Sequence, residues 1–141
     1  MISSPIVVDS SAIIAILRNE PERDRLLAAL NASAANFCSM VTFFESFMVS
    51  TSRNANAPVA LHLRLLEDLG IEAAPLDQKQ AVLAAEAFAR FGKGRHPAKL
   101  NLGDCFSYAL AKSLNAPLLY KGEYFGRTDL VAAVASQELR P

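Results

Sequence analysis

Three carboxylates of this 141-residue chain occur where carboxylates are unusual. Asp9 directly follows the apolar run IVV, Glu45 lies within VTFFESFMV, and Asp104 lies within NLGDCFSYALA. An ionised carboxylate is expensive to bury unless a cation, hydrogen bonds or an open cleft compensates for the lost water. Each of the three acids therefore needs a structural or a chemical explanation.

Together, these three acids could bind a metal ion through oxygen ligands alone. The chain has two histidines and two cysteines, with no CxxC pair, which argues strongly against a zinc site built from Cys and His. Carboxylate oxygens suit Mg²⁺ and Mn²⁺. One or two such ions can activate water and stabilise the charge that develops on a phosphodiester.

Each acid also has an ordinary structural explanation. Asp9 could cap a helix that begins near Ser11. Glu45 could project from the polar edge of its helix. Asp104 could be a first-turn acid that the helix dipole favours. At the level of sequence both kinds of explanation stay open, and the coincidence of three such acids favours a site.

The elements that must position these acids alternate along the chain between short apolar runs and amphipathic segments. Strands are expected at residues 5–9, 35–40, 71–75 and 116–120, and helices at 10–18, 19–32, 41–53, 57–70, 76–92 and 102–115. Such alternation predicts an α/β fold with three layers, α/β/α, around a central, mostly parallel sheet of four to five strands. Ligands of such sheets bind outside the carboxyl ends of the strands, and Asp9 follows the first strand.

Several helix ends can be read from single residues. Ser10 or Ser11 is expected to cap the first helix, and Pro21 to occupy the first turn of the second. Asp77 is expected to open the helix that Gly92 closes. These signals give approximate boundaries for the predicted elements.

Length, charge and hydropathy restrict the class of protein. The chain is expected to form a single domain over residues 1–141, with formal net charge zero from 14 basic and 14 acidic residues. It has no apolar run of about 18 residues and no basic region at its N-terminus, so neither a membrane span nor a secretory signal is expected. A cytoplasmic protein is the resulting expectation.

The apolar residues include a few that bear on partners and on redox state. Phe43, Phe44 and Phe47 are expected mainly in the core, while any apolar surface left exposed could serve a dimer or a groove for a partner protein. Cys38 and Cys105 are expected as small buried residues rather than as a disulfide.

A local basic patch is possible even though the whole chain is neutral. The basic loop, residues 93–101 with the sequence KGRHPAKLN, contains no acid. It is either a solvated loop or a rim that binds RNA phosphates. The residues predicted to bind RNA are Arg90, Lys93, Arg95 and Lys99, and Lys121 and Arg127 could extend the patch.

The segments VVDSSAIIAIL, TFFESFMV and LNLGDCFSYALAKSLNAPLLYKGEYFGRTDL together resemble PIN-domain ribonucleases, and most closely the VapC-type toxins of bacterial toxin–antitoxin pairs. The resemblance implies an endoribonuclease that depends on Mg²⁺ or Mn²⁺ and cuts structured RNA such as tRNA or rRNA. It also implies a homodimer and inhibition by a cognate VapB-type antitoxin. By position, Asp9, Glu45 and Asp104 match the first three acids of the family's quartet, and Asp9 and Asp104 match its main metal ligands.

The fourth acid of the quartet is where this chain departs from the resemblance. Relatives often have an Asp before the Phe of a KGxDF motif, and this chain has Tyr124 there. Asp129, or else Glu123, could supply the missing carboxylate, and Thr128 could orient Asp129. Ser11 is expected to support Asp9 from beside the metal.

Two other functions compete with the nuclease at this stage. The first is an RNA- or protein-binding module on the same fold, whose catalytic site has decayed at Tyr124. The second is a phosphotransfer enzyme with Asp9 as its nucleophile. That chemistry usually uses another acid two residues on, where this chain has Ser11.

Overall fold

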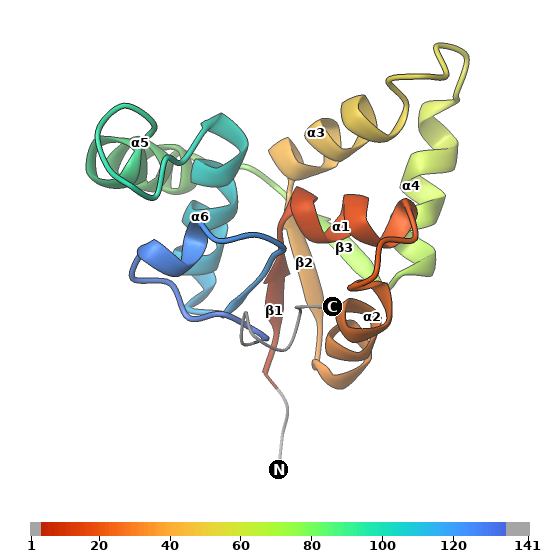
Figure 1. Cartoon of the computed structure of the whole chain (residues 1–141), viewed down its shortest axis with the longest axis horizontal. Helices are drawn as coiled ribbons and strands as arrows, with labels where there is room; N and C mark the ends of the chain where they lie inside the picture. The colour runs from red at the N-terminus through yellow and green to blue at the C-terminus, as the bar shows by residue number, and fades with distance from the viewer. Residues whose placement is uncertain (1–3, 135–141) are drawn as a thin grey trace.

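A parallel four-stranded sheet forms the centre of the molecule in the computed structural model, which describes residues 4–134 (Figure 1). The strands are β1 (Ile6–Val8), β2 (Asn36–Ser39), β3 (Ile71–Ala74) and β4 (Leu118–Leu119), in the spatial order β3-β2-β1-β4. Val7 of β1 pairs with Phe37 on one side and with Leu118 on the other. All four predicted strands are confirmed, as is the parallel sheet.

Helices cover both faces of the sheet, so the predicted three-layer architecture is also confirmed. They are α1 (Ser10–Leu17), α2 (Arg23–Ala32), α3 (Met40–Ser50), α4 (Val59–Asp68), α5 (Gln78–Phe91), α6 (Leu102–Leu114) and a 3₁₀ turn, η1 (Phe125–Arg127). In Figure 1, α5 and α6 lie on one side of the sheet and α1, α2 and α4 on the other. Within residues 4–134, no helix is long and apolar enough to cross a bilayer.

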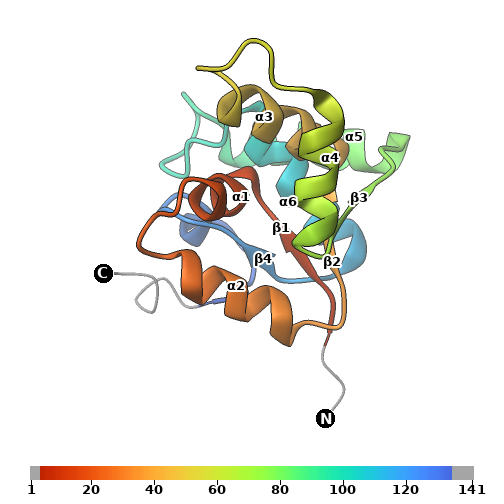
Figure 2. The same ribbon diagram turned by 90° about the vertical axis from the view of Figure 1, so that its right-hand side faces the viewer.

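The alternation of side chains along β1 divides the core between the two faces. Val7 packs into the cluster formed with α5 and α6, whereas Ile6 and Val8 pack against α1, α2 and α4. The turned view in Figure 2 shows α1, α2 and α4 in front of the sheet, with α5 and α6 behind it. A strand that is buried on both faces must be apolar at every position, which is why β1 has the sequence IVV.

Most helix ends agree with the signals in the sequence, but two predictions are wrong. Asp77 caps α5 by accepting a hydrogen bond from the Gln80 N–H at 2.8 Å, and Gly92 follows the last residue of that helix. The cap of α1 is Asp9 rather than a serine. Helix α2 begins at Arg23, so Pro21 lies before it.

The segment before α2 is held away from helical geometry by contacts that are distant in sequence. Asn19 adopts a left-handed conformation with φ 53°. The ammonium group of Lys121 lies 3.0 Å from Glu20 and 3.2 Å from Glu22. These ion pairs tie residues 19–22 to the loop after β4, which explains the late start of α2.

The outer face of α3 departs from the expected core. Phe44 is 57% exposed, so its assignment to the core is wrong, and Met40 and Met48, one turn away on either side, are also exposed. Phe43 and Phe47 turn inward and pack around the His62 ring of α4. Helix α3 therefore presents an unpartnered apolar stripe at i, i+4 spacing.

Candidate active site

Asp9 is the buried centre of the site and also the cap of α1. It follows β1 at the carboxyl end of the sheet and is 2% exposed. Its Oδ2 accepts hydrogen bonds from the Ser11 N–H at 3.0 Å and from the Ser11 hydroxyl at 2.7 Å, while its Oδ1 accepts one from the Ser107 hydroxyl at 2.5 Å. A carboxylate can accept about four hydrogen bonds, so Asp9 is fixed in orientation and retains one acceptor position.

A chain of buried hydroxyls connects Asp9 to two further helices. Ser107 lies on α6, and its Oγ is 3.2 Å from the Oγ1 of Thr42 on α3. Both residues are completely buried. The prediction from sequence did not include Ser107, although it lies three residues after Asp104 and therefore near the same face of the helix.

Glu45 reaches the site from α3. Its Oε1 accepts a hydrogen bond from the hydroxyl of Ser10, the residue that follows Asp9. Burial raises the pKa of Glu45, the Ser10 hydrogen bond opposes this, and the charge of Asp9 raises it further. The carboxylate is therefore held close to Asp9.

Gly103 provides the surface on which the Glu45 carboxylate rests. A Cβ at Gly103 would lie only 2.6 Å from the Glu45 Cδ and closer still to both carboxylate oxygens. Side-chain atoms do not approach so closely, so the carboxylate occupies space that only glycine leaves free. Sequence reasoning missed this residue because a glycine before the acid carries no chemical group.

Asp104 has a structural role at the start of α6 and is also affected by the charges of the other two acids. It forms a capping box at the start of α6, with hydrogen bonds from its own N–H to the Asn101 Oδ1 (2.9 Å) and from the Asn101 N–H to its Oδ2 (3.0 Å). The pKa of Asp104 is raised to about 6, mainly by burial and also by the charges of Asp9 and Glu45, while the Asn101 hydrogen bond lowers it. A capping residue thus also faces two other carboxylates.

A divalent cation fits the chemistry of this group of acids. Asp9, Glu45 and Asp104 offer only oxygen donors, and their mutual repulsion would be relieved by positive charge. Within residues 4–134, no three His, Cys, Asp or Glu side chains form a ready set of metal ligands. Mg²⁺ is commonly held by only one or two carboxylates together with water, which suits Asp9 and Asp104.

The predicted fourth acid, Asp129, lies in a different set of contacts. Its Oδ1 accepts a hydrogen bond from the Tyr108 hydroxyl at 2.7 Å, and its Oδ2 is 2.8 Å from the Lys112 ammonium and 3.5 Å from Arg90. Burial alone would raise the pKa of Asp129, but the hydrogen bonds from Lys112 and Tyr108 outweigh it and hold the pKa below its usual value. Its charge is therefore already compensated.

The other predicted positions are spread around the site. The Thr128 hydroxyl donates to the Phe125 carbonyl at 2.7 Å and accepts from the Leu130 N–H, which stabilises a turn. Glu123 is exposed. Among the predicted RNA-binding residues, Lys93, Arg95 and Lys99 are exposed in the basic loop, and Arg90 is exposed at the end of α5.

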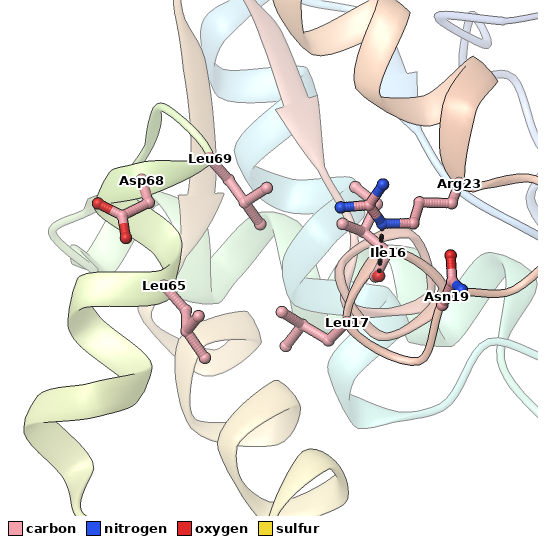
Figure 3. A pocket seen from close by; sticks show the side chains of 7 residues that line it. All are labelled: Ile16, Leu17, Asn19, Arg23, Leu65, Asp68 and Leu69. Atoms are coloured by element: carbon pink, nitrogen blue, oxygen red, sulfur yellow. Dashed lines mark hydrogen bonds between the residues drawn. The ribbon is translucent and has the colours of Figure 1, made fainter.

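A hollow of about 530 Å³ lies elsewhere on the molecule, between α1 and α4 (Figure 3). Leucine and isoleucine side chains line it, with Arg23 and Asp68 on opposite sides. The Arg23 Nε donates to the Ile16 carbonyl at 3.2 Å. None of the three site carboxylates lines this hollow, so it is separate from the candidate active site.

Comparisons with known proteins agree with this fold. The PIN domain family matches residues 6–131. A protein named Ribonuclease VapC from Mycolicibacterium smegmatis is 42% identical over 128 residues, which cover 90% of this chain and 98% of that one. Ribonuclease VapC30 from Mycobacterium tuberculosis is 40% identical over 131 residues, covering 92% and 98% of the two chains.

Two solved structures share the fold at low sequence identity. The toxin VapC20 from Mycobacterium tuberculosis superposes with a TM-score of 0.70 at 15% identity, over 89% of this chain and 96% of that one. A toxin–antitoxin complex from Klebsiella pneumoniae gives a TM-score of 0.67 at 19% identity, over 90% and 95%. The chain therefore belongs to the PIN-domain family and, within it, to the VapC ribonucleases.

Divalent cations should stabilise the protein more at neutral than at acidic pH. The pKa of Asp104 is raised to about 6, above its value in the unfolded chain, so its ionisation lowers the stability of the metal-free protein as pH rises through that value. Mn²⁺ should bind the ionised form and raise Tm by about 5–10 °C at a hundredfold excess over Kd near pH 7.5, and by less near pH 5. Thermal scans at both pH values measure this.

The matched control for the metal experiment is Asp68→Asn, which neutralises an exposed acid away from the site. That variant should keep the full gain in Tm from Mn²⁺, and Asp104→Asn should lose it. A gain that is the same at both pH values, or that persists in Asp104→Asn, would contradict the assignment of Asp104 as a ligand.

Replacing Gly103 with Ala should displace the Glu45 carboxylate and leave the fold intact, because the obstructed atoms are the end of a flexible side chain. A displacement of about 1 Å in an active site costs on the order of 100-fold in rate, so RNA cleavage should fall by about that factor. Gly126→Ala is the control, because its Cβ would meet only the Tyr120 Oη, at an ordinary 3.5 Å. In a Glu45→Ala background Gly103→Ala should cost nothing more, and an equal further loss there would show that Gly103 acts elsewhere.

Proposed function

We propose that the protein is a metal-dependent endoribonuclease that hydrolyses RNA phosphodiester bonds and acts as the toxin of a type II toxin–antitoxin pair. The observation that carries the proposal is the geometry of the acids in a chain of the VapC ribonuclease family: the Glu45 carboxylate lies against Gly103, next to Asp104, and is hydrogen-bonded to Ser10, next to Asp9. Mg²⁺ and Mn²⁺ prefer oxygen ligands, and their positive charge would offset the repulsion among the three carboxylates.

In this mechanism Asp9 and Asp104 would hold the ion, which would supply the positive charge needed to activate water and stabilise the phosphodiester. Ser11 and Ser107 keep the Asp9 carboxylate in one orientation before the ion arrives. Burial raises the pKa of Glu45 and so suits its carboxylate to accept a proton from the attacking water.

The partners follow from the same acids and from the family. An antitoxin of the VapB type would place an Arg or Lys near the three carboxylates, where a charge-assisted hydrogen bond is strongest. The toxin–antitoxin complex with the same fold supports a partner of this kind. The apolar stripe on α3, formed by Met40, Phe44 and Met48, would suit a homodimer contact.

The substrate is proposed to be structured cellular RNA, such as tRNA or rRNA, in the cytoplasm. VapC20, which shares this fold, is described as a sarcin–ricin loop cleaving toxin. The exposed cations of the basic loop would bind phosphates of such an RNA without taking part in the chemistry.

Asp9→Asn and Asp104→Asn should each reduce RNA cleavage by at least about 100-fold, because each removes a charged oxygen ligand. Cleavage of total RNA with Mg²⁺ or Mn²⁺ measures the loss, and Asp68→Asn is the acid-to-amide control. Expression of the unaltered chain should arrest growth, and co-expression of the antitoxin should restore it. A purified protein that binds RNA but never cuts it would instead support the alternative of a decayed binding module.

Asp129→Asn should lower cleavage markedly if Asp129 is the fourth acid, and Glu123→Gln should matter less. Serving a second ion would require Asp129 to exchange its ion pair with Lys112 for the metal. Lys112→Met breaks the same ion pair and keeps the carboxylate, so it should leave cleavage intact. Equal losses of activity and Tm in Asp129→Asn and Lys112→Met would assign Asp129 a purely structural role.

A further inference from the structure

Tyr124 exposes its side chain from a segment whose backbone is anchored. The side chain is 48% exposed, and its carbonyl accepts a hydrogen bond from the Arg127 N–H at 3.0 Å. The next residue, Phe125, is buried and packs against Tyr120 with ring centroids 5.2 Å apart. A neighbour in the core thus anchors the Tyr124 backbone and leaves the side chain exposed at the surface.

Two cations flank the Tyr124 ring. The Lys99 Nζ lies 5.9 Å from the ring centroid and the Arg127 Cζ lies 6.0 Å from it. Both distances are at the outer limit of a cation–π contact, so neither cation is stacked tightly on the ring. Arg127 also donates to the Pro97 carbonyl at 3.2 Å, which joins the basic loop to η1.

Lys99 is held in a conformation that lysine rarely adopts. Its φ is 51°, in the left-handed region that disfavours a residue with a Cβ. Its neighbours Ala98 and Leu100 are completely buried, and the Leu100 N–H donates to the Phe91 carbonyl. The core therefore fixes the backbone on both sides of an exposed lysine, and such strain is often retained at binding sites.

The loop that carries Tyr124 is connected to the Asp9 carboxylate through Ser11. The Lys121 N–H donates to the Ser11 hydroxyl at 3.0 Å, and that hydroxyl donates to Asp9. Tyr124 comes three positions after Lys121, so their Cα atoms are at most about 11 Å apart. The Tyr124 backbone therefore lies close to a residue that is hydrogen-bonded to Ser11, the partner of Asp9.

We propose that Tyr124, Lys99 and Arg127 form a nucleotide subsite, in which an unpaired RNA base stacks on the Tyr124 ring while the two cations neutralise the neighbouring phosphates. An exposed aromatic ring beside basic groups is the combination that proteins use to bind single-stranded RNA. The subsite rests on the proposed function, and it gives Tyr124 a task in substrate binding. RNA fits better than an acidic peptide, which would need the cations but not the ring.

The test measures binding of a short single-stranded RNA that carries 2-aminopurine, in EDTA so that no cleavage occurs. Stacking on Tyr124 should quench the probe at one position of the strand. Tyr124→Ala should abolish this quenching and weaken binding by about 5- to 100-fold, the usual cost of losing one base–aromatic stack. Tyr124→Phe, which keeps the ring, should stay within about twofold of the unaltered protein. Phe44→Ala, which removes an exposed ring on α3, should change nothing.

Salt dependence separates the ring from the cations. Lys99→Ala and Arg127→Ala should each reduce the slope of log K against log salt by about one, and Tyr124→Ala should leave the slope unchanged. Double-stranded RNA without unpaired bases should bind equally to Tyr124→Ala and to the unaltered protein. Equal Tm values for all variants would establish that each is folded.

Unchanged RNA binding and quenching in Tyr124→Ala would overturn the subsite. So would a Tyr124→Ala protein that binds RNA normally but has lost affinity for the purified antitoxin. Because these measurements need no metal and no cleavage, they also separate the two proposals. Position-specific quenching in a protein that never cuts RNA would support the subsite and contradict the proposed nuclease function. Cleavage with Mg²⁺ by a protein that shows no quenching would do the reverse.

Discussion

The hydrogen bonding of the buried Asp9 carboxylate is the interaction on which the rest of the site depends. An ionised carboxylate that is 2% exposed is tolerable only when its oxygens are well bonded, and Ser11 and Ser107 provide those bonds. Through Ser107, and from there Thr42, the same carboxylate connects β1 with α6 and α3. One buried carboxylate therefore caps a helix and joins three elements.

The positions of Glu45 and Asp104 carry an electrostatic cost that a bound cation would remove. Glu45 rests against Gly103, and Asp104 begins α6, so both are brought toward Asp9 by elements whose packing is fixed elsewhere. The raised pKa of Asp104 expresses that cost, because burial and two like charges disfavour its ionised form. Outside this centre the cations of the basic loop lie on the surface. The net charge of zero thus combines an acidic site inside the protein with basic residues on the surface. This separation of charge would suit a metal ion at the acids and a polyanion at the surface.

Local patterns predicted the fold well because strands and helices depend mainly on neighbours in sequence. The runs IVV and IEAA became β1 and β3, and Asp77 capped α5 as expected. One failure arose where distant groups intervened. Helix α2 starts late because Lys121 pairs with the segment before it, and no local pattern can show an ion pair over about a hundred residues.

The sequence by itself determined the chemistry of the site: oxygen-only acids in apolar surroundings, and the segments through which the family is recognised. Only the tertiary structure decided which groups accompany them. Ser107 reaches Asp9 across 98 residues, Gly103 contributes the absence of a side chain, and Asp129 is paired with Lys112. The physical reason is that acidity and hydropathy belong to a residue alone, whereas orientation, free space and compensating charge arise only when packing brings distant segments together.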